Sequence, residues 1–172
     1  MCLIHSIGGA FTRRPEELAH KLSEKASDLV KRAFDDIDPQ RIIVHHVHVA
    51  GVGAGGTFVN RKMRTWAHPF HRLKFKVYMS SAGATDEDRA DSQLVERLAS
   101  LVSHIRNHGK HRLLAFDKHY RSDGSGNLEN TEFYVPNEYV FELAERYSDL
   151  FVPNISVNPY RPDAISELEK WA

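Results

Sequence analysis

The chain has 172 residues, of which 41% are hydrophobic and 27% charged, and this composition is typical of one globular domain with a buried core. Lysine and arginine total 23 and so do aspartate and glutamate, so the zero formal charge excludes a general attraction to nucleic acid or to an anionic membrane. Cys2 is the single cysteine, which excludes an internal disulfide framework and a thiolate-rich metal site.

The first half of the chain is predicted to contain two helices and one strand. Apolar residues at helical spacing predict a helix over residues 15–36, and a β-branched run predicts a strand over residues 41–51. Residues 51–69 read as a loop at first. Residues 73–79 alternate apolar and polar side chains, which fits a strand or a short helix, and residues 86–107 are predicted to form a helix.

The second half repeats the alternation of strands and helices. We predict a strand over residues 111–120, a helix from Pro136 or Asn137 through Tyr147, a strand over residues 151–160 and a helix over residues 162–172. This order is typical of an α/β fold whose parallel strands are joined by right-handed crossovers. No apolar run approaches the ~18 residues that a membrane span needs, and the first residues lack a signal-peptide pattern, so we expect a cytoplasmic protein.

A pair of histidines in the first predicted strand is the main chemical signal. His46 and His48 are two residues apart, so their side chains leave an extended strand on the same side, whereas His45 points the other way. Two such imidazoles can bind one divalent metal ion. A catalytic metal site has about three protein ligands and an open position for water. The alternative is that the pair occurs by chance in a chain with 11 histidines.

Polar side chains follow the other two predicted strands. Because α/β folds place ligands at the carboxyl ends of their strands, these residues are candidates for the substrate side of the same site. For each of them the alternative is a solvated or hydrogen-bonded loop residue. They are Asp117, Lys118 and His119 after the second strand, and Asn158, Tyr160 and Arg161 after the third.

Three segments resemble a known superfamily. The first strand ends in HHVHVAG, the second segment reads HRLLAFDKHY, and the last reads FVPNISVNPYRPDAISELEKWA. Together they resemble the first three βα units of the metal-dependent amidohydrolase superfamily, in its amidohydrolase-2 branch. In this chain Val44 stands where the family has an acidic residue before its paired histidines.

The resemblance implies a (β/α)8 TIM-barrel-type fold with a divalent metal at its carboxyl-terminal mouth. A full barrel takes ~250 residues, so this single α/β domain, residues 1–172, would comprise an N-terminal helical extension (1–40) and a partial barrel (41–172). The paired ligands carry over onto His46 and His48. The implied cofactor is zinc, with manganese or iron as alternatives, and the implied reaction is hydrolysis of a carbon–nitrogen or related bond by metal-activated water.

Four further motifs have weaker interpretations. GVGAGG (51–56) matches a dinucleotide-binding pattern, but the histidine-bearing strand before it and the poor helix after it favour a flexible loop beside the metal.

Cys2 could act as an N-terminal nucleophile, although Leu3 follows it. The basic and aromatic residues of 60–78 could bind single-stranded nucleic acid, but zero net charge favours an amphipathic segment that packs outside a barrel or covers its mouth. Lys118 could be a carbamylated bridging ligand.

The sequence therefore predicts a metal-dependent hydrolase acting on a small-molecule substrate, without nucleic-acid or membrane partners. One alternative is a non-catalytic truncated half-barrel, stable only with a second copy or a missing C-terminal half. The others are a metal-dependent decarboxylase of the same superfamily and a nucleotide-binding α/β module.

Overall fold

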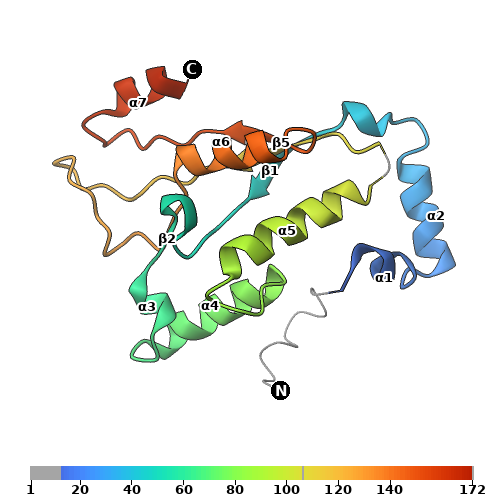
Figure 1. Ribbon diagram of the computed structural model, residues 1–172, viewed down its shortest axis with the longest axis horizontal. Helices are drawn as coiled ribbons and strands as arrows, with labels where there is room; N and C mark the ends of the chain where they lie inside the picture. Colours follow the sequence, from blue (N-terminus) through green and yellow to red (C-terminus); the bar gives the residue numbers. More distant parts are fainter. Residues whose placement is uncertain (1–12, 106, 172) are drawn as a thin grey trace.

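A three-stranded parallel sheet is the centre of the computed structural model, which describes residues 13–105 and 107–171 (Figure 1). Its strands are β1 (Ile43–His48), β3 (Lys110–Leu114) and β5 (Phe151–Asn154), in the order β1-β3-β5. Both neighbouring pairs are parallel, so all three strands end at the same edge of the sheet. The prediction of an α/β fold with parallel strands is confirmed.

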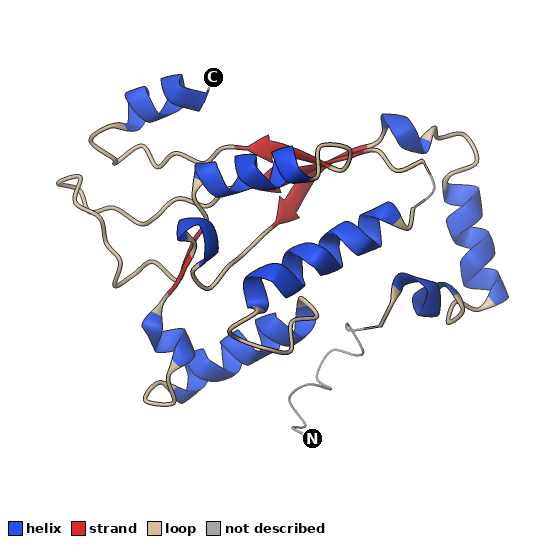
Figure 2. Ribbon diagram, viewed as in Figure 1, coloured by secondary structure: helices blue, strands red, loops and turns tan. Residues whose placement is uncertain are grey.

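Two helices supply most of the core that packs around the sheet. They are α5 (Ala90–Ser103) and α6 (Asn137–Arg146), and Figure 2 shows α6 lying across the strands. Leu113 of the central strand is fully buried, as are Val140 and Leu143 on α6. Val95, Ala99 and Val102 of α5 belong to the same cluster because their spacing places them on one helix face. A last helix, α7 (Ala164–Trp171), packs Trp171 against Phe141 of α6.

The expected single helix over residues 15–36 is wrong, because the structure has two short helices there. α1 spans Pro15–Ala19 and α2 spans Glu24–Ala33. Ser23 begins the second helix, since its hydroxyl accepts a hydrogen bond from the backbone N–H of Ala26 at 3.2 Å. Figure 1 shows both helices beside the rest of the molecule rather than over the sheet. The single turn η2 (Pro39–Arg41) then leads into β1.

Residues 73–79 are helical, which decides between the two predictions for that segment. They lie in α4 (Pro69–Ser81), where Pro69 occupies the first turn. Phe75 and Met79 are one turn apart and both are buried, so the side chains follow the helical rather than the strand period. Together with the buried Met63 they form a second core cluster.

Short elements that the sequence did not predict connect this second cluster to the sheet. After β1 come the single turn η3 (Ala54–Gly56), the strand β2 (Phe58–Val59) and the helix α3 (Arg61–Arg64). β2 pairs antiparallel with β4 (Phe133–Tyr134), so the loops that follow β1 and β3 meet.

The predicted strands are longer than the observed ones. We expected residues 41–51, 111–120 and 151–160, whereas β1, β3 and β5 end at His48, Leu114 and Asn154. The polar residues beyond these ends leave the sheet because side chains bind their backbone: Ser156 Oγ accepts from the N–H of Asp117, and Asp117 Oδ2 accepts from the N–H of Asn158. No helix among the residues described is both long and apolar enough to cross a membrane.

Candidate metal and ligand-binding site

The two candidate ligands converge at the carboxyl end of β1. The Nε2 atoms of His46 and His48 are 2.8 Å apart, and their ring centroids are 4.6 Å apart. Both side chains are exposed. This proximity fits the prediction that the two side chains lie on the same side of the strand, and their role as metal ligands stays a prediction.

A β-bulge in β1 includes the first histidine of this pair. Val44 pairs with His111 and Val47 pairs with Leu113, so two residues of β1 oppose one residue of β3. Such a bulge bends a strand locally and re-aims the side chains that it carries. The two residues in the bulge are His45 and His46. The simple two-residue alternation used for the prediction is thus interrupted at the pair itself.

The two imidazoles fit as two ligands of one metal ion. The 2.8 Å contact is a hydrogen bond in which one Nε2 donates to the other. Zinc at ~2.0–2.1 Å from each nitrogen would separate two tetrahedral ligand atoms by about 3.3 Å, so metal binding would replace this hydrogen bond and move the Nε2 atoms apart by about 0.5 Å. Partial desolvation of the His48 ring, and then the neighbouring His46, lower the pKa of His48, which favours the neutral imidazole that can donate a lone pair to a metal. Within the described part of the chain, no group of three or more histidine, cysteine, aspartate or glutamate side chains could hold a metal ion.

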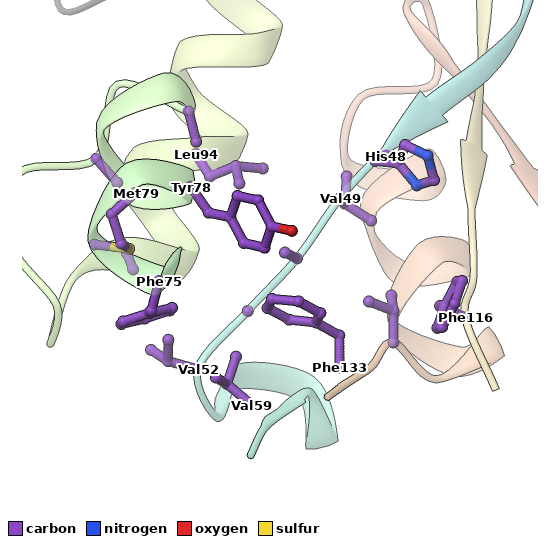
Figure 3. A pocket seen from close by; sticks show the side chains of 16 residues that line it. His48, Val49, Val52, Val59, Phe75, Tyr78, Met79, Leu94, Phe116 and Phe133 are labelled. Carbon is purple, nitrogen blue, oxygen red and sulfur yellow. The ribbon is translucent and has the colours of Figure 1, made fainter. Parts of the chain in front are cut away.

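An apolar cavity of about 430 Å³ adjoins His48 (Figure 3). One wall is the backbone that follows β1, and α4 supplies the facing wall with Phe75, Tyr78 and Met79. Figure 3 shows Tyr78 reaching across from α4 toward the chain after β1. Its other lining residues are Val49, Ala50, Gly51, Val52, Val59, Ala82, Ala84, Ala90, Leu94, Phe116, Phe133 and Val135.

A buried carboxylate organises the ends of β3 and β5. The side chain of Asp117 is only 5% exposed. Its Oδ1 accepts from the N–H of Lys118 at 2.7 Å, and its Oδ2 accepts from the N–H of Asn158 at 2.8 Å and from Arg161 Nη1 at 3.3 Å. A carboxylate with three donors is held in place, so Asp117 positions its neighbours rather than serving as a free base.

Arg161 extends this network onto the last helix. Its guanidinium donates to Asp163 at 2.9 Å and lies 3.4 Å from a carboxylate oxygen of Glu167. The hydrogen bond to Asp163, and the nearby charge of Asp117, raise the pKa of Arg161. The arginine is therefore a fixed cation that links the loop after β5 to α7 and to Asp117.

A second hollow, of about 370 Å³, opens over this network. It brings together four of the predicted residues, Asp117, His119, Asn158 and Tyr160, and it also includes Tyr120, Ser156 and Pro159. Phe116 lines both this polar hollow and the apolar cavity. The two spaces therefore meet at that ring.

Lys118 is placed differently from its neighbours. Its Nζ lies 4.3 Å from the centroid of the Tyr134 ring, which is a cation–π distance. Burial, and then Asp117, raise the pKa of Tyr134 to about 12, so this phenol stays protonated at neutral pH. The position of Lys118 on an aromatic face indicates packing of the loop and gives no support to a bridging metal ligand.

Sequence reasoning missed the walls of the apolar cavity. Phe75 and Tyr78 were expected to pack outside a barrel or to cover its mouth, and they lie over the ends of the strands. Phe133 and Val135 were not singled out, although the β-branched and aromatic run around them was a signal of a short strand. Ser156 and Tyr120 in the polar hollow carried no distinguishing pattern.

The glycine loop after β1 is held by hydrogen bonds. Asp91 Oδ1 accepts from the N–H of Val52 at 2.9 Å and from the hydroxyl of Thr57 at 3.1 Å. A Cβ at Gly51 would lie 1.9 Å from that same Oδ1, which explains the glycine. The loop runs into η3 and β2 rather than into a helix that opens on a phosphate, so its geometry differs from a dinucleotide-binding turn.

Basic side chains of residues 60–78 are paired with acidic ones. Lys74 donates to Glu132 at 2.7 Å, and Arg72 donates to Glu87 at 2.8 Å. Lys62, Arg64 and Lys76 also lie against acidic partners, on Glu129, Asp88 and Glu87 respectively. These pairs neutralise much of the positive charge of the segment. Cys2, for which the sequence does not favour a nucleophilic role, lies outside the described residues.

Comparisons of the chain with protein-family models, with curated proteins and with solved structures find no match. The resemblance to the amidohydrolases therefore stays a prediction that rests on the residues themselves.

Proposed function

We propose that this protein is a metal-dependent hydrolase of the amidohydrolase type. The observation that carries the proposal is the convergence of two imidazole Nε2 atoms at 2.8 Å, at the carboxyl end of a parallel strand and beside a cavity. Ligands of α/β folds bind at that end of the strands, and neutral imidazole is a common ligand of catalytic zinc.

In this proposal His46 and His48 hold the metal. Zinc is the expected ion, with manganese or iron as alternatives, since imidazole suits several metals. When bound, such an ion supplies a water that loses its proton near neutral pH and can attack a carbonyl carbon. The lowered pKa of His48 favours one unprotonated ligand, and the apolar cavity beside it offers a binding surface for the apolar part of a substrate.

The polar hollow supplies the substrate-facing surface of the proposed site. Asp117 fixes the loops that carry His119 and Asn158, through hydrogen bonds to two backbone N–H groups. We propose that the parallel sheet corresponds to the first three βα units of a barrel. Further metal ligands and a general base would then come from strands that follow these three.

The first test measures the metal content of purified protein. We expect the wild type to retain measurably more zinc than the double variant His46→Ala, His48→Ala, because only the wild type carries the pair of neutral imidazoles. His45→Ala is the matched control, since it removes the exposed neighbour in the same bulge and should leave the zinc content unchanged. Elemental analysis that finds full zinc in the double variant would contradict the proposal.

A second candidate is the non-catalytic half-barrel that needs a partner. Within the described residues each of β1 and β5 has a single neighbouring strand, so both outer edges of the sheet are open. Large apolar side chains are also exposed on helices away from the cavity, including Leu29 and Val30 of α2 and Ile165 of α7. Both features are typical of surfaces that a partner covers.

A further inference from the structure

We propose that the apolar cavity beside His48 selects a neutral aromatic group of the ligand, with an amide or ester carbonyl directed toward the histidine pair. The role of the carbonyl rests on the proposed function, whereas the preference for a neutral aromatic group rests on the residues that line the cavity. The ligand class that fits is an uncharged aromatic amide or ester.

The chemistry of the wall favours an aromatic group. Four rings line the space, from Phe75 and Tyr78 on α4, Phe116 after β3 and Phe133 on β4. Tyr78 and Phe133 already contact each other, with centroids 5.7 Å apart and an interplanar angle of 47°. Aromatic rings prefer offset or edge-to-face neighbours at such distances, so a further ring of the ligand would find partners on several sides.

The size of the cavity suits more than one ring. A cavity of about 150 Å³ lined by apolar side chains accommodates a benzene molecule. The space here is about 430 Å³. A ligand with two rings, or with one ring and a branched aliphatic group, therefore fits.

The wall also discriminates against charge. Among the described residues that line the cavity, only His48 and Tyr78 have polar side-chain atoms, and none carries a fixed charge. An ionised carboxylate or ammonium placed there would lose its hydration without gaining a partner, which is strongly unfavourable. The hollow on the far side of the glycine loop differs, since Arg64, Arg89 and Arg146 lie on its wall with several acidic residues.

The position of His48 fixes the orientation of the ligand. His48 both lines the cavity and contacts His46, so the histidine pair lies at one limit of the apolar space. A ligand whose ring fills the cavity therefore places its polar group near the Nε2 atoms. Phe116 lines both the apolar cavity and the polar hollow. The part of the ligand on the other side of its carbonyl group would therefore lie in the polar hollow, near His119 and Asn158.

The test is a fluorescence titration with phenylnaphthylamine, a neutral aromatic fluorophore, in the presence of a metal chelator. We expect saturable binding with one molecule per chain. Ala82→Phe, which fills the cavity from a half-buried wall position just after α4, should weaken binding by at least about tenfold. Ala67→Phe is the matched control, since Ala67 is exposed and outside the cavity, and it should bind as the wild type does.

Competition on the wild type keeps the test independent of how the variants fold. Benzanilide should displace the fluorophore at least about tenfold better than its para-carboxylate analogue, because the carboxylate loses its hydration in the cavity. Equal displacement by the two compounds, or unchanged binding in a folded Ala82→Phe, would overturn the inference. Binding measured without metal depends on the cavity alone, so its failure is distinguishable from loss of zinc in the histidine variants.

Discussion

Glu87 illustrates how a single charged residue stabilises α4, the helix that forms one wall of the apolar cavity. Its carboxylate accepts from Arg72 Nη1 at 2.8 Å and from Lys76, both on α4, while Glu87 itself precedes α5. The side chain of Arg72 is 10% exposed and that of Glu87 is 21% exposed. The hydrogen bond from Arg72 is the main cause that lowers the pKa of Glu87 to about 2. An ion pair so placed is costly to break, because one charge is left buried and unpaired.

Removing this carboxylate should destabilise the protein in a pH-dependent way. The folded pKa is about 2 and the unfolded value is near 4.5, so the stabilisation is fully present above pH 4.5 and is lost as the pH falls toward 2. We expect Glu87→Gln to lower the free energy of unfolding by about 2 kcal/mol at pH 7, after allowance for solvent screening. Urea unfolding at pH 7 and at pH 3 should show this difference shrinking at the lower pH.

Glu132→Gln is the matched control for that measurement. Glu132 also pairs with a lysine of α4, Lys74, at 2.7 Å, but the side chains of Lys74 and Glu132 are 41% and 45% exposed. Exposed pairs contribute ~0–1 kcal/mol, so this variant should differ little from the wild type. A loss in Glu132→Gln as large as that in Glu87→Gln would show that burial is not the cause.

At the scale of elements, the side-chain amide of Asn60 connects the segments that follow β1 and β3. Asn60 precedes α3, and its Oδ1 accepts from the N–H of Lys62 at 2.9 Å. Its Nδ2 donates to the carbonyls of Leu128 and Glu129 at 3.1 Å and of Thr131 at 3.0 Å. This single side chain therefore joins the segment after β1 to the segment after β3, next to the β2–β4 pairing.

Truncating that amide should loosen both segments. Asn60→Ala leaves the buried carbonyl of Thr131, the partly buried carbonyls of Leu128 and Glu129 and the N–H of Lys62 without their partner, and we expect a loss of about 2–3 kcal/mol in the free energy of unfolding. Asn130→Ala, an exposed change in the same loop, should cost less than about 0.5 kcal/mol. Urea titrations followed by tryptophan fluorescence give both values, and equal losses in the two variants would contradict the role assigned to Asn60.

At the scale of the whole molecule, the two candidate functions differ in what completes the fold. A metal site within one chain stabilises that chain by mass action, because the ion binds the folded state alone. An open half-barrel instead requires a second surface over the edges of β1 and β5 and over the exposed apolar residues of α2. Size-exclusion mass and a thermal melt, each with and without zinc, separate these outcomes.

The hydrolase proposal predicts a melt that responds to zinc. At a free zinc concentration of about 100 Kd the gain is ~2.7 kcal/mol, which for a chain of this size raises Tm by roughly 5–10 °C. The gain should disappear in the double histidine variant and should shrink as the pH is lowered, because protonated imidazole binds no metal. A multimeric mass with no response to zinc would favour the half-barrel.

The sequence by itself determined the alternation of strands and helices, the parallel sheet and the position of the histidine pair at a strand end. These follow from local properties, since β-branched runs, helical periodicity and polar residues at strand ends are read within about ten residues. The break before Ser23 is local as well, because its capping hydroxyl interrupts the helical periodicity of residues 15–36. Only the tertiary structure decided that 73–79 is helical, because Phe75 and Met79 are buried in a cluster with Met63 and Ala90. The apolar cavity depends on contacts between segments some eighty residues apart in the sequence, and a local sequence pattern cannot predict which distant segments come into contact.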